Sequence, residues 1–176
     1  MQGVHWPLTI ERRAKAMSDG ALPYPTEANA YLVGHLALLR QSLRKLAGRD
    51  LLDAGLSPQE TAERIFHAPF VVLSHGAGAD PVLTYGNLKA LELFEVSWAE
   101  LTRMPSRLTA EAPDRGERAR LLRQVSERGF IDDYAGVRVS ATGRRFRIAD
   151  ATVWNLVDAD GRVCGQAATF AQWRYL

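Results

Sequence analysis

The sequence predicts an α+β fold in which a five-stranded antiparallel sheet has helices on one face. Strand patterns occur in two groups, at residues 70–74 and 82–85 and then at residues 130–140, 144–157 and 162–173. Helical patterns lie between the two groups. Strands gathered before and after a block of helices are typical of α+β domains rather than of alternating α/β domains.

The N-terminal region is expected to contain an arm and two helices. Residues 1–26 carry three prolines and form the arm, and Thr26 can cap a helix from Glu27 to Ala47. Apolar residues recur there at three- and four-residue steps, which predicts one apolar face. A serine, a proline and a glutamate in capping positions predict a second helix from Pro58 to His67. The chain therefore divides into an N-terminal segment, residues 1–68, and a body, residues 69–176.

The body begins with two short strands and then turns helical. A glycine-rich loop containing Gly76 and Gly78 joins the strands, but it lacks the spacing of a phosphate-binding motif, so a plain connection is the simpler interpretation. Asn87 can cap the first helix of the body, and a capping box beginning at Ser97 predicts the next one. A longer helix is expected from Asp114 to Arg128.

The C-terminal part is expected to form three strands joined by tight turns. Asp158 to Gly161 is a hairpin signal between the last two. Residues 144–157 alternate in hydrophobicity, as a strand with one buried face does. The alternation predicts that one side of this strand carries Phe146, Ile148, Thr152, Trp154 and Leu156.

Several segments, in order along the chain, resemble the MEKHLA domain. They are PFVVLSHGAGADPVLTYGN, ALELFEVSWAELTRMPSR, ERARLLRQVSERGFIDDYAGVRVS and GRRFRIADATVWNLVDADGRVCGQAATF, and the resemblance covers roughly residues 35 to 173. That domain occurs as small stand-alone bacterial proteins and in plant class III homeodomain-leucine-zipper factors, and it is regarded as PAS-related. The resemblance implies a PAS-like fold and a role in sensing, regulation or dimerisation. It implies no particular catalytic residue, cofactor or substrate.

A PAS-like fold would hold a ligand between the inner face of the sheet and the middle helices. Such a pocket is mainly apolar, with a few convergent polar groups. The simpler interpretation is that the same residues only fill the core. The residues expected to line the pocket are Leu73, Tyr85, Leu101, Met104, Leu122, Ile148, Trp154 and Thr169.

The sequence argues against two cofactors. Covalent flavin chemistry needs a cysteine in the middle helices, but the only cysteine, Cys164, falls on the last strand. A haem ligand is commonly a histidine on the helix from Asp114 to Arg128, which contains none, while His67 and His75 border the first strand. A single cysteine also excludes a multi-cysteine metal site. Non-covalent flavin and a small organic acid stay open.

Charge patterning gives one candidate anion-binding or partner-binding face. Arg145 and Arg147 share one side of a predicted strand and could bind an anion, or they could pair with acids of the N-terminal helix. The net charge is only +2, and no aromatic stacking pattern accompanies these arginines, which argues against nucleic acid. No apolar run approaches the ~18 residues that span a membrane, and no signal-peptide core is present, so the cytoplasm is expected.

Together these features predict a non-catalytic sensory or regulatory module that binds a small molecule or a protein partner. The leucine stripe of the N-terminal helix should either cover the open face of the sheet or pair with a second copy as a homodimer; it comprises Leu32, Leu36, Leu39 and Leu43. The alternative is a small α+β enzyme with chemistry in the sheet cavity. Tyr85, Asp133 and Trp154 would then be its polar residues, and the cavity would hold a carboxylate with a raised pKa.

Overall fold

The computed structural model describes residues 21–53 and 55–176, except for the side chains of residues 112–115, 117, 118 and 122. Its sheet has the order β2-β1-β5-β4-β3 with antiparallel neighbours, which confirms the predicted five-stranded sheet. The last predicted strand is present as two strands, and both pair with β4. The strands are β1 (Val71–Gly76), β2 (Leu83–Gly86), β3 (Phe130–Val139), β4 (Arg145–Val157), β5 (Val163–Phe170) and β6 (Gln172–Tyr175).

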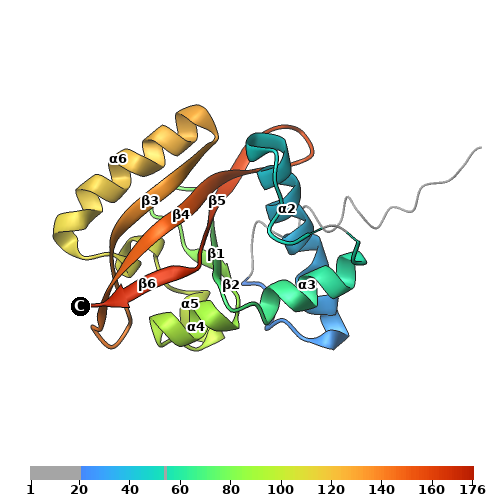
Figure 1. Cartoon of the computed structure of the whole chain (residues 1–176), viewed down its shortest axis with the longest axis horizontal. Helices are drawn as coiled ribbons and strands as arrows, with labels where there is room; N and C mark the ends of the chain where they lie inside the picture. Colours follow the sequence, from blue (N-terminus) through green and yellow to red (C-terminus); the bar gives the residue numbers. More distant parts are fainter. Residues whose placement is uncertain (1–20, 54) are drawn as a thin grey trace, which may run out of the picture.

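Helices pack on both faces of this sheet. Figure 1 shows α6 on one side of the strands and α2 on the other, with α4 and α5 below the sheet. We call the face toward α6 the inner face and the face toward α2 the outer face. The helices are α2 (Val33–Ala47), α3 (Pro58–Phe66), α4 (Leu88–Phe94), α5 (Trp98–Leu101) and α6 (Ala112–Arg128), with the 3-10 helices η2 (Glu27–Leu32) and η3 (Ser106–Thr109).

The predicted helix starts are confirmed by their hydrogen bonds. At the start of α3, the Ser57 hydroxyl accepts from the Glu60 amide at 3.2 Å, and the Glu60 carboxylate accepts from the Ser57 amide at 2.9 Å. The Asn87 side chain caps α4 by accepting from the Ala90 amide at 3.1 Å. These caps satisfy backbone donors that a helix leaves unpaired at its first turn, so short-range sequence signals fix where these helices begin.

The predicted helix from Glu27 to Ala47 is present in two parts. Three consecutive residues, Ala30 to Leu32, have φ between 50° and 58°, which ends η2 before α2 begins. Left-handed backbone is uncommon for residues other than glycine and signals a position fixed by its surroundings. Here the Tyr31 ring lies against the rings of Phe66 and His67, with centroids 5.8 and 5.6 Å apart. The break therefore lets the Tyr31 ring of η2 pack against the end of α3.

The leucine stripe of α2 packs on the outer face of the sheet of its own chain. Leu36, Leu39 and Leu43 are at most 1% exposed and belong to one buried cluster with Trp154. The Trp154 indole donates to the Leu39 carbonyl at 3.0 Å, which satisfies its polar group inside the core. Covering the sheet is thus the arrangement adopted by these leucines, and they would reach a second copy only if α2 left the sheet.

The alternation predicted for residues 144–157 is interrupted in the middle of β4. Asp150 has φ 51° and lies between the β3 pairings Gly136↔Ile148 and Tyr134↔Ala151, so it forms a bulge. Because a one-residue shift exchanges the faces of a strand, Ile148 stays on the inner face while Trp154 turns to the outer face. The prediction that both share one side is therefore wrong.

Candidate functional site

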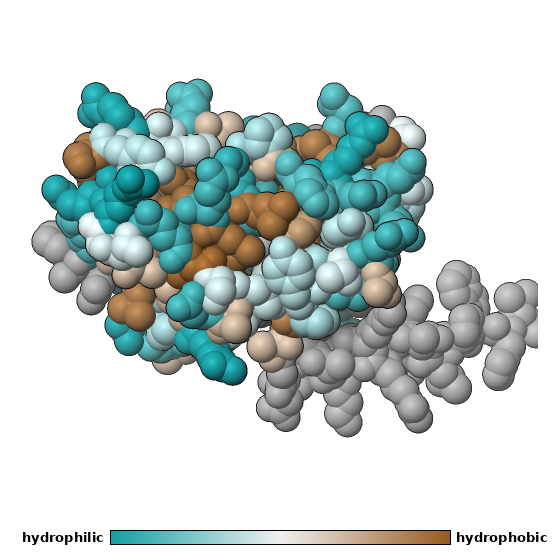
Figure 2. All heavy atoms as spheres, turned by 90° about the horizontal axis from the view of Figure 1, so that it is seen from below, coloured by the Kyte–Doolittle hydropathy of each residue, from teal (hydrophilic) through white to brown (hydrophobic). Residues whose placement is uncertain are grey.

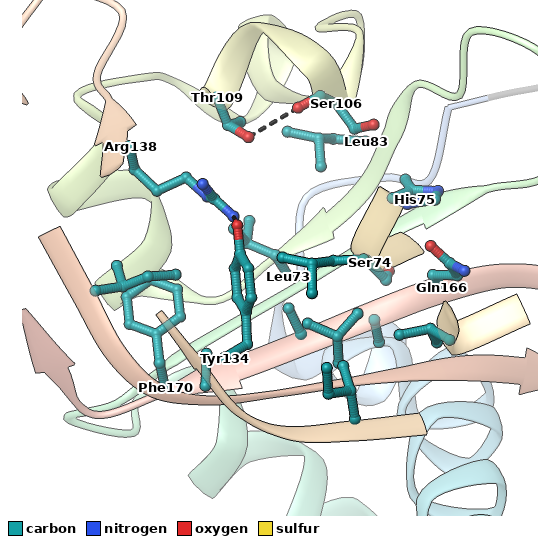
Figure 3. A pocket seen from close by; sticks show the side chains of 18 of the residues that line it. Leu73, Ser74, His75, Leu83, Ser106, Thr109, Tyr134, Arg138, Gln166 and Phe170 are labelled. Carbon is teal, nitrogen blue, oxygen red and sulfur yellow. Dashed lines mark hydrogen bonds between the residues drawn. The ribbon is translucent and has the colours of Figure 1, made fainter. Parts of the chain in front are cut away.

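A cavity lies between the inner face of the sheet and the helical segments η3 and α6. Its volume is about 70 Å³, several times the ~10–15 Å³ that one water molecule needs. Most of its wall is apolar, and five strands and three helical segments contribute to it (Figure 3). The apolar lining residues include Leu73, Leu83, Phe94, Val125, Ile131, Ile148, Ala151, Val153, Ala168 and Phe170.

One pole of this cavity is polar and is formed by β3. Arg138 is 7% exposed, and its guanidinium donates to the Tyr134 hydroxyl at 2.5 Å and to the Val137 carbonyl at 2.8 Å. The guanidinium carbon also lies 5.0 Å from the centre of the Tyr134 ring, within the range of a cation–π contact. Figure 3 shows the tips of the two side chains meeting inside the pocket, below the hydroxyls of Ser106 and Thr109.

Gly136 makes room for this pair. A Cβ at that position would lie 2.7 Å from the Tyr134 hydroxyl and 3.2 Å from the nearer guanidinium nitrogen of Arg138. Tyr134, Gly136 and Arg138 are two residues apart and so share one side of β3. The glycine therefore allows a large phenol and a guanidinium to lie together over the strand.

The opposite wall of the cavity carries a hydrogen-bonded amide pair. The Gln166 amide on β5 donates to the Asn155 side-chain oxygen on β4 at 3.0 Å. The Asn155 amide in turn donates to the Val125 carbonyl in α6 at 3.0 Å. Both amides are buried, and this chain of bonds connects the cavity wall to the C-terminal end of α6.

The structure brings together two of the eight residues predicted to line the pocket, Leu73 and Ile148. Leu101 and Met104 pack in the same inner cluster but not at the cavity wall, and Leu101 instead lies beside Gly86. The Leu122 side chain lies outside the described part of the chain.

The other three predicted residues lie away from the cavity. Tyr85 and Trp154 belong to the buried cluster beneath α2, because bulges in β2 and β4 turn them to the outer face. Thr169 lies one residue from the cavity residues Ala168 and Phe170, and its hydroxyl donates to the Val71 carbonyl at 2.9 Å. Side chains adjacent in a strand point to opposite faces, which explains its position.

Sequence reasoning missed the polar residues of the cavity, above all Arg138 and Tyr134. The available signal was the pattern Tyr-x-Gly-x-Arg at residues 134–138, which places two large polar side chains on one strand face with a glycine between them. Arg145 and Arg147, the arginines predicted to bind an anion, do not line the cavity. Both of those are exposed, and Arg145 pairs with Glu111 at the start of α6 rather than with an acid of the N-terminal helix.

A second buried polar cluster connects α2 to the sheet. The His35 ring nitrogen Nε2 lies 2.9 Å from the Ser74 hydroxyl, which lies 3.0 Å from the Thr84 hydroxyl. Burial lowers the pKa of His35 to about 4 and raises the pKa of Tyr85, whose ring lies 5.6 Å from the imidazole. Within the described residues, His35 Nδ1 and the Tyr85 hydroxyl have no hydrogen-bond partner. His35 is therefore neutral at pH 7.

The remaining candidates are not at the cavity. Asp133 is exposed at a bulge of β3, with φ 59°. Cys164 is half-buried beside the outer-face cluster, where burial raises the pKa of its thiol. The described residues contain no group of three or more His, Cys, Asp or Glu side chains that could hold a metal ion. Among those same residues, no helix is both long and apolar enough to cross a membrane.

The family comparison matches this architecture over most of the chain. The MEKHLA domain matches residues 33–175. The chain belongs to the MEKHLA family. The match agrees with the resemblance seen between residues 35 and 173, and it includes α2 and α3 as well as the sheet.

Curated relatives of this chain include plant homeobox-leucine zipper proteins that are much longer. The homeobox-leucine zipper protein HOX29 of Oryza sativa subsp. indica is 29% identical over 124 residues, which are 69% of this chain and 14% of that protein. The homeobox-leucine zipper protein ATHB-14 of Arabidopsis thaliana is 26% identical over 98 residues, 56% of this chain and 12% of that protein. The MEKHLA chain thus spans 14% or less of the length of these relatives.

Solved structures show that the MEKHLA chain has a PAS-like fold. A PAS domain from Colwellia psychrerythraea has TM-score 0.57 at 10% identity, covering 67% of this chain and 95% of that one. An RNA-binding light-oxygen-voltage receptor has TM-score 0.55 at 20% identity, covering 68% and 33%. A variant of the fungal photoreceptor VVD has TM-score 0.51 at 16% identity, covering 75% and 91%. At these identities the likeness concerns the fold alone.

Proposed function

We propose that this MEKHLA domain is a non-catalytic sensory or regulatory module that binds a small molecule in the inner-face cavity. The observation that carries the proposal is the cavity itself, which lies between the sheet and η3 and α6 and combines an apolar wall with a few polar groups. That combination is typical of small-molecule sites. Its volume of about 70 Å³ is well below the roughly 300–1,000 Å³ of pockets for drug-sized ligands, which favours a small ligand.

The contacts of α2 support a route by which ligand binding in the cavity would change the surface of the protein. α2 is tied to the strands that line the cavity by three polar contacts, from His35 to Ser74, from Trp154 to the Leu39 carbonyl and from the Val157 amide to Ser42. A ligand that shifted β1 or β4 would therefore change the contacts that hold α2. In this proposal the position of α2 is the output read by a protein partner.

The surface offers room for such a partner. Figure 2 shows apolar side chains gathered near the middle of the face seen from below, with hydrophilic side chains around them. The most exposed large apolar side chains of the described residues are Val163, Tyr175 and Leu176, with exposed fractions of 53%, 49% and 56%. Val163 lies opposite Val157 at one end of β4 and Tyr175 lies opposite Phe146 near the other end, so these side chains do not form one patch. An apolar patch with hydrophilic side chains around it, as in Figure 2, is typical of interaction sites.

Native mass spectrometry of the protein purified from its own host tests the proposal. We expect a bound small molecule in stoichiometric amount and its loss in an Ala168→Leu variant, because Ala168 faces the cavity between Leu73 and Val153. Ala99→Leu is the matched control, since Ala99 is exposed on α5. A protein that is empty, and that stays empty with small-molecule extracts of its host, would contradict small-molecule sensing.

The enzyme alternative has less support. It requires a carboxylate of raised pKa inside the cavity, together with Tyr85, Asp133 and Trp154. None of the described lining residues is an aspartate or a glutamate, and none of these three lines the cavity. Turnover that was lost on substitution of Asp133 would nevertheless favour it over the binding module.

A further inference from the structure

We infer that the cavity binds a small monocarboxylate whose carboxylate pairs with Arg138 and whose apolar part fills the space beside Leu73, Ile148 and Phe170. The inference rests on the proposed function and names the chemical class of its ligand. It is carried by a buried cation at a cavity wall, which is a feature that a filled apolar core does not need.

The charge of Arg138 is not compensated within the described residues. A guanidinium carries a positive charge, and the Arg138 residue is only 7% exposed, so little of its surface contacts water. Its hydrogen-bond partners, the Tyr134 hydroxyl and the Val137 carbonyl, are neutral and use two of its five N–H donors. Buried charges are normally paired, so an anion is the missing partner that this arrangement favours.

Three acids of the described residues, Glu95, Glu111 and Asp132, are paired with other arginines. Glu95 accepts from the Ser140 hydroxyl and lies 3.5 Å from Arg144. Glu111 pairs with Arg145, and Asp132 pairs with Arg49. The three carboxylate side chains are 27–37% exposed. No described carboxylate therefore forms an ion pair with Arg138.

The shape of the site matches one carboxylate rather than a larger anion. A guanidinium binds a carboxylate through two parallel hydrogen bonds, and the Thr109 and Tyr134 hydroxyls lie at the same pole (Figure 3). The rest of the wall is apolar, and burying a second charge there without a partner would be costly. A volume of about 70 Å³ is below the ~150 Å³ of a cavity that holds benzene, which limits the apolar part to a short aliphatic chain.

Binding of acids and their matched amides tests the inference. Butanoate, hexanoate and benzoate would be titrated into the full chain by calorimetry at constant ionic strength, beside butanamide, hexanamide and benzamide. We expect saturable binding of at least one acid, with the matching amide at least ~10-fold weaker because it lacks the charge. Arg138→Met should weaken acid binding about 100-fold, as loss of a buried charge pair does. Arg138→Lys should fall between, since it keeps the charge but not the two-pronged geometry.

Stability separates a binding role for Arg138 from a structural one. If the guanidinium serves a ligand, Arg138→Met removes an uncompensated buried charge, and the ligand-free protein should melt at the same or a higher temperature. If it serves only the fold, the melting temperature should fall. Arg147→Met is the matched control, because Arg147 is exposed on β4, and it should leave acid binding unchanged.

Three results would overturn the inference: amides that bind as tightly as acids, acid binding that survives Arg138→Met, or no saturable binding of any of the three acids. The proposed function fails differently. A neutral molecule that co-purifies and is lost in Ala168→Leu would keep the sensory function and reject the acid. A protein that binds nothing in the cavity would reject both.

Discussion

The two faces of the sheet are built differently, although the same strands form both. Beneath α2 and α3 the outer face is packed with large side chains, and the indole of Trp154 is hydrogen-bonded among them. The hollow beside this packed region, lined among others by Leu43, Thr152 and Thr169, is more open than the inner cavity. The inner face holds a cavity with a buried cation at one wall. Because filled interiors stabilise a fold while cavities cost stability, the contrast separates a face that holds the domain together from a face that can accept a ligand.

The largest expected difference between the faces is in stability. Leu39→Ala should lower the free energy of unfolding by about 4 kcal/mol, because Leu39 is 0% exposed under α2 and leaves a new hole in a filled region. Leu73→Ala should cost about 2 kcal/mol, since Leu73 already borders the cavity and makes fewer contacts to lose. Urea unfolding measures both.

Lys45→Ala, at an exposed position of α2, is the control and should change stability by less than about 0.5 kcal/mol. Equal losses for the two leucine variants would remove the contrast between the faces. If Leu39→Ala left stability intact and only changed the oligomeric state in size-exclusion chromatography, the leucine stripe would be a dimer contact instead.

Acid should loosen the outer face first. The pKa of folded His35 is about 4 and its unfolded value is 6.5, so the unfolded chain binds more protons between these two values. The free energy of unfolding therefore has its full value above pH 6.5 and decreases as the pH falls toward 4. The loss should be up to about 3 kcal/mol.

Unfolding measured from pH 7 to pH 4 in wild type and in His35→Gln tests this, because the variant should lack the steep part of the curve. His67→Gln, at an exposed histidine of the α3 C-terminus, is the matched control and should keep it. If the free energy of unfolding fell equally with pH in wild type and in His35→Gln, the imidazole of His35 would become protonated in the folded protein within this pH range.

A smaller effect is expected from crowding the polar pole of the inner face. Gly136→Ala should destabilise the domain by about 2 kcal/mol, because the new Cβ would lie 2.7 Å from the Tyr134 hydroxyl and something must shift. Gly116→Ala is the matched control, since a Cβ there meets nothing within 4 Å and alanine favours a helix. If Gly136→Ala left the stability unchanged, the Tyr134 and Arg138 side chains would have space to move away from the new Cβ.

The smallest predicted effect concerns the bulge that separates the faces. Asp150 has φ 51° and is exposed, so Asp150→Gly should stabilise the domain by about 0.5 kcal/mol, as glycine adopts this conformation without strain. Asp150→Val should destabilise it, because a β-branched residue resists positive φ. Thermal melting compares the two. If Asp150→Gly and Asp150→Val melted at the same temperature, residue 150 would have ordinary strand geometry in solution.

Much of the fold could be predicted from the sequence, and rather less of the site. The starts of α3, α4 and α5 followed from Ser57, Asn87 and Ser97, because a cap depends on residues only three positions apart. The antiparallel sheet followed from the order of its strand patterns, and the apolar face of α2 from its spacing. The pocket list failed at Tyr85 and Trp154, since alternation assumes a regular strand and both β2 and β4 contain bulges.

The sequence by itself therefore determined the PAS-like order of elements, the starts of α3, α4 and α5 and the apolar stripe of α2, because each depends on neighbours along the chain. Only the tertiary structure decided which side chains share a face after Asp150, and which acid meets which arginine. Glu95, Glu111 and Asp132 come from three separate segments and pair with Arg144, Arg145 and Arg49. Whether an acid is left to pair with Arg138 depends on these contacts between distant segments, which form only when the chain packs.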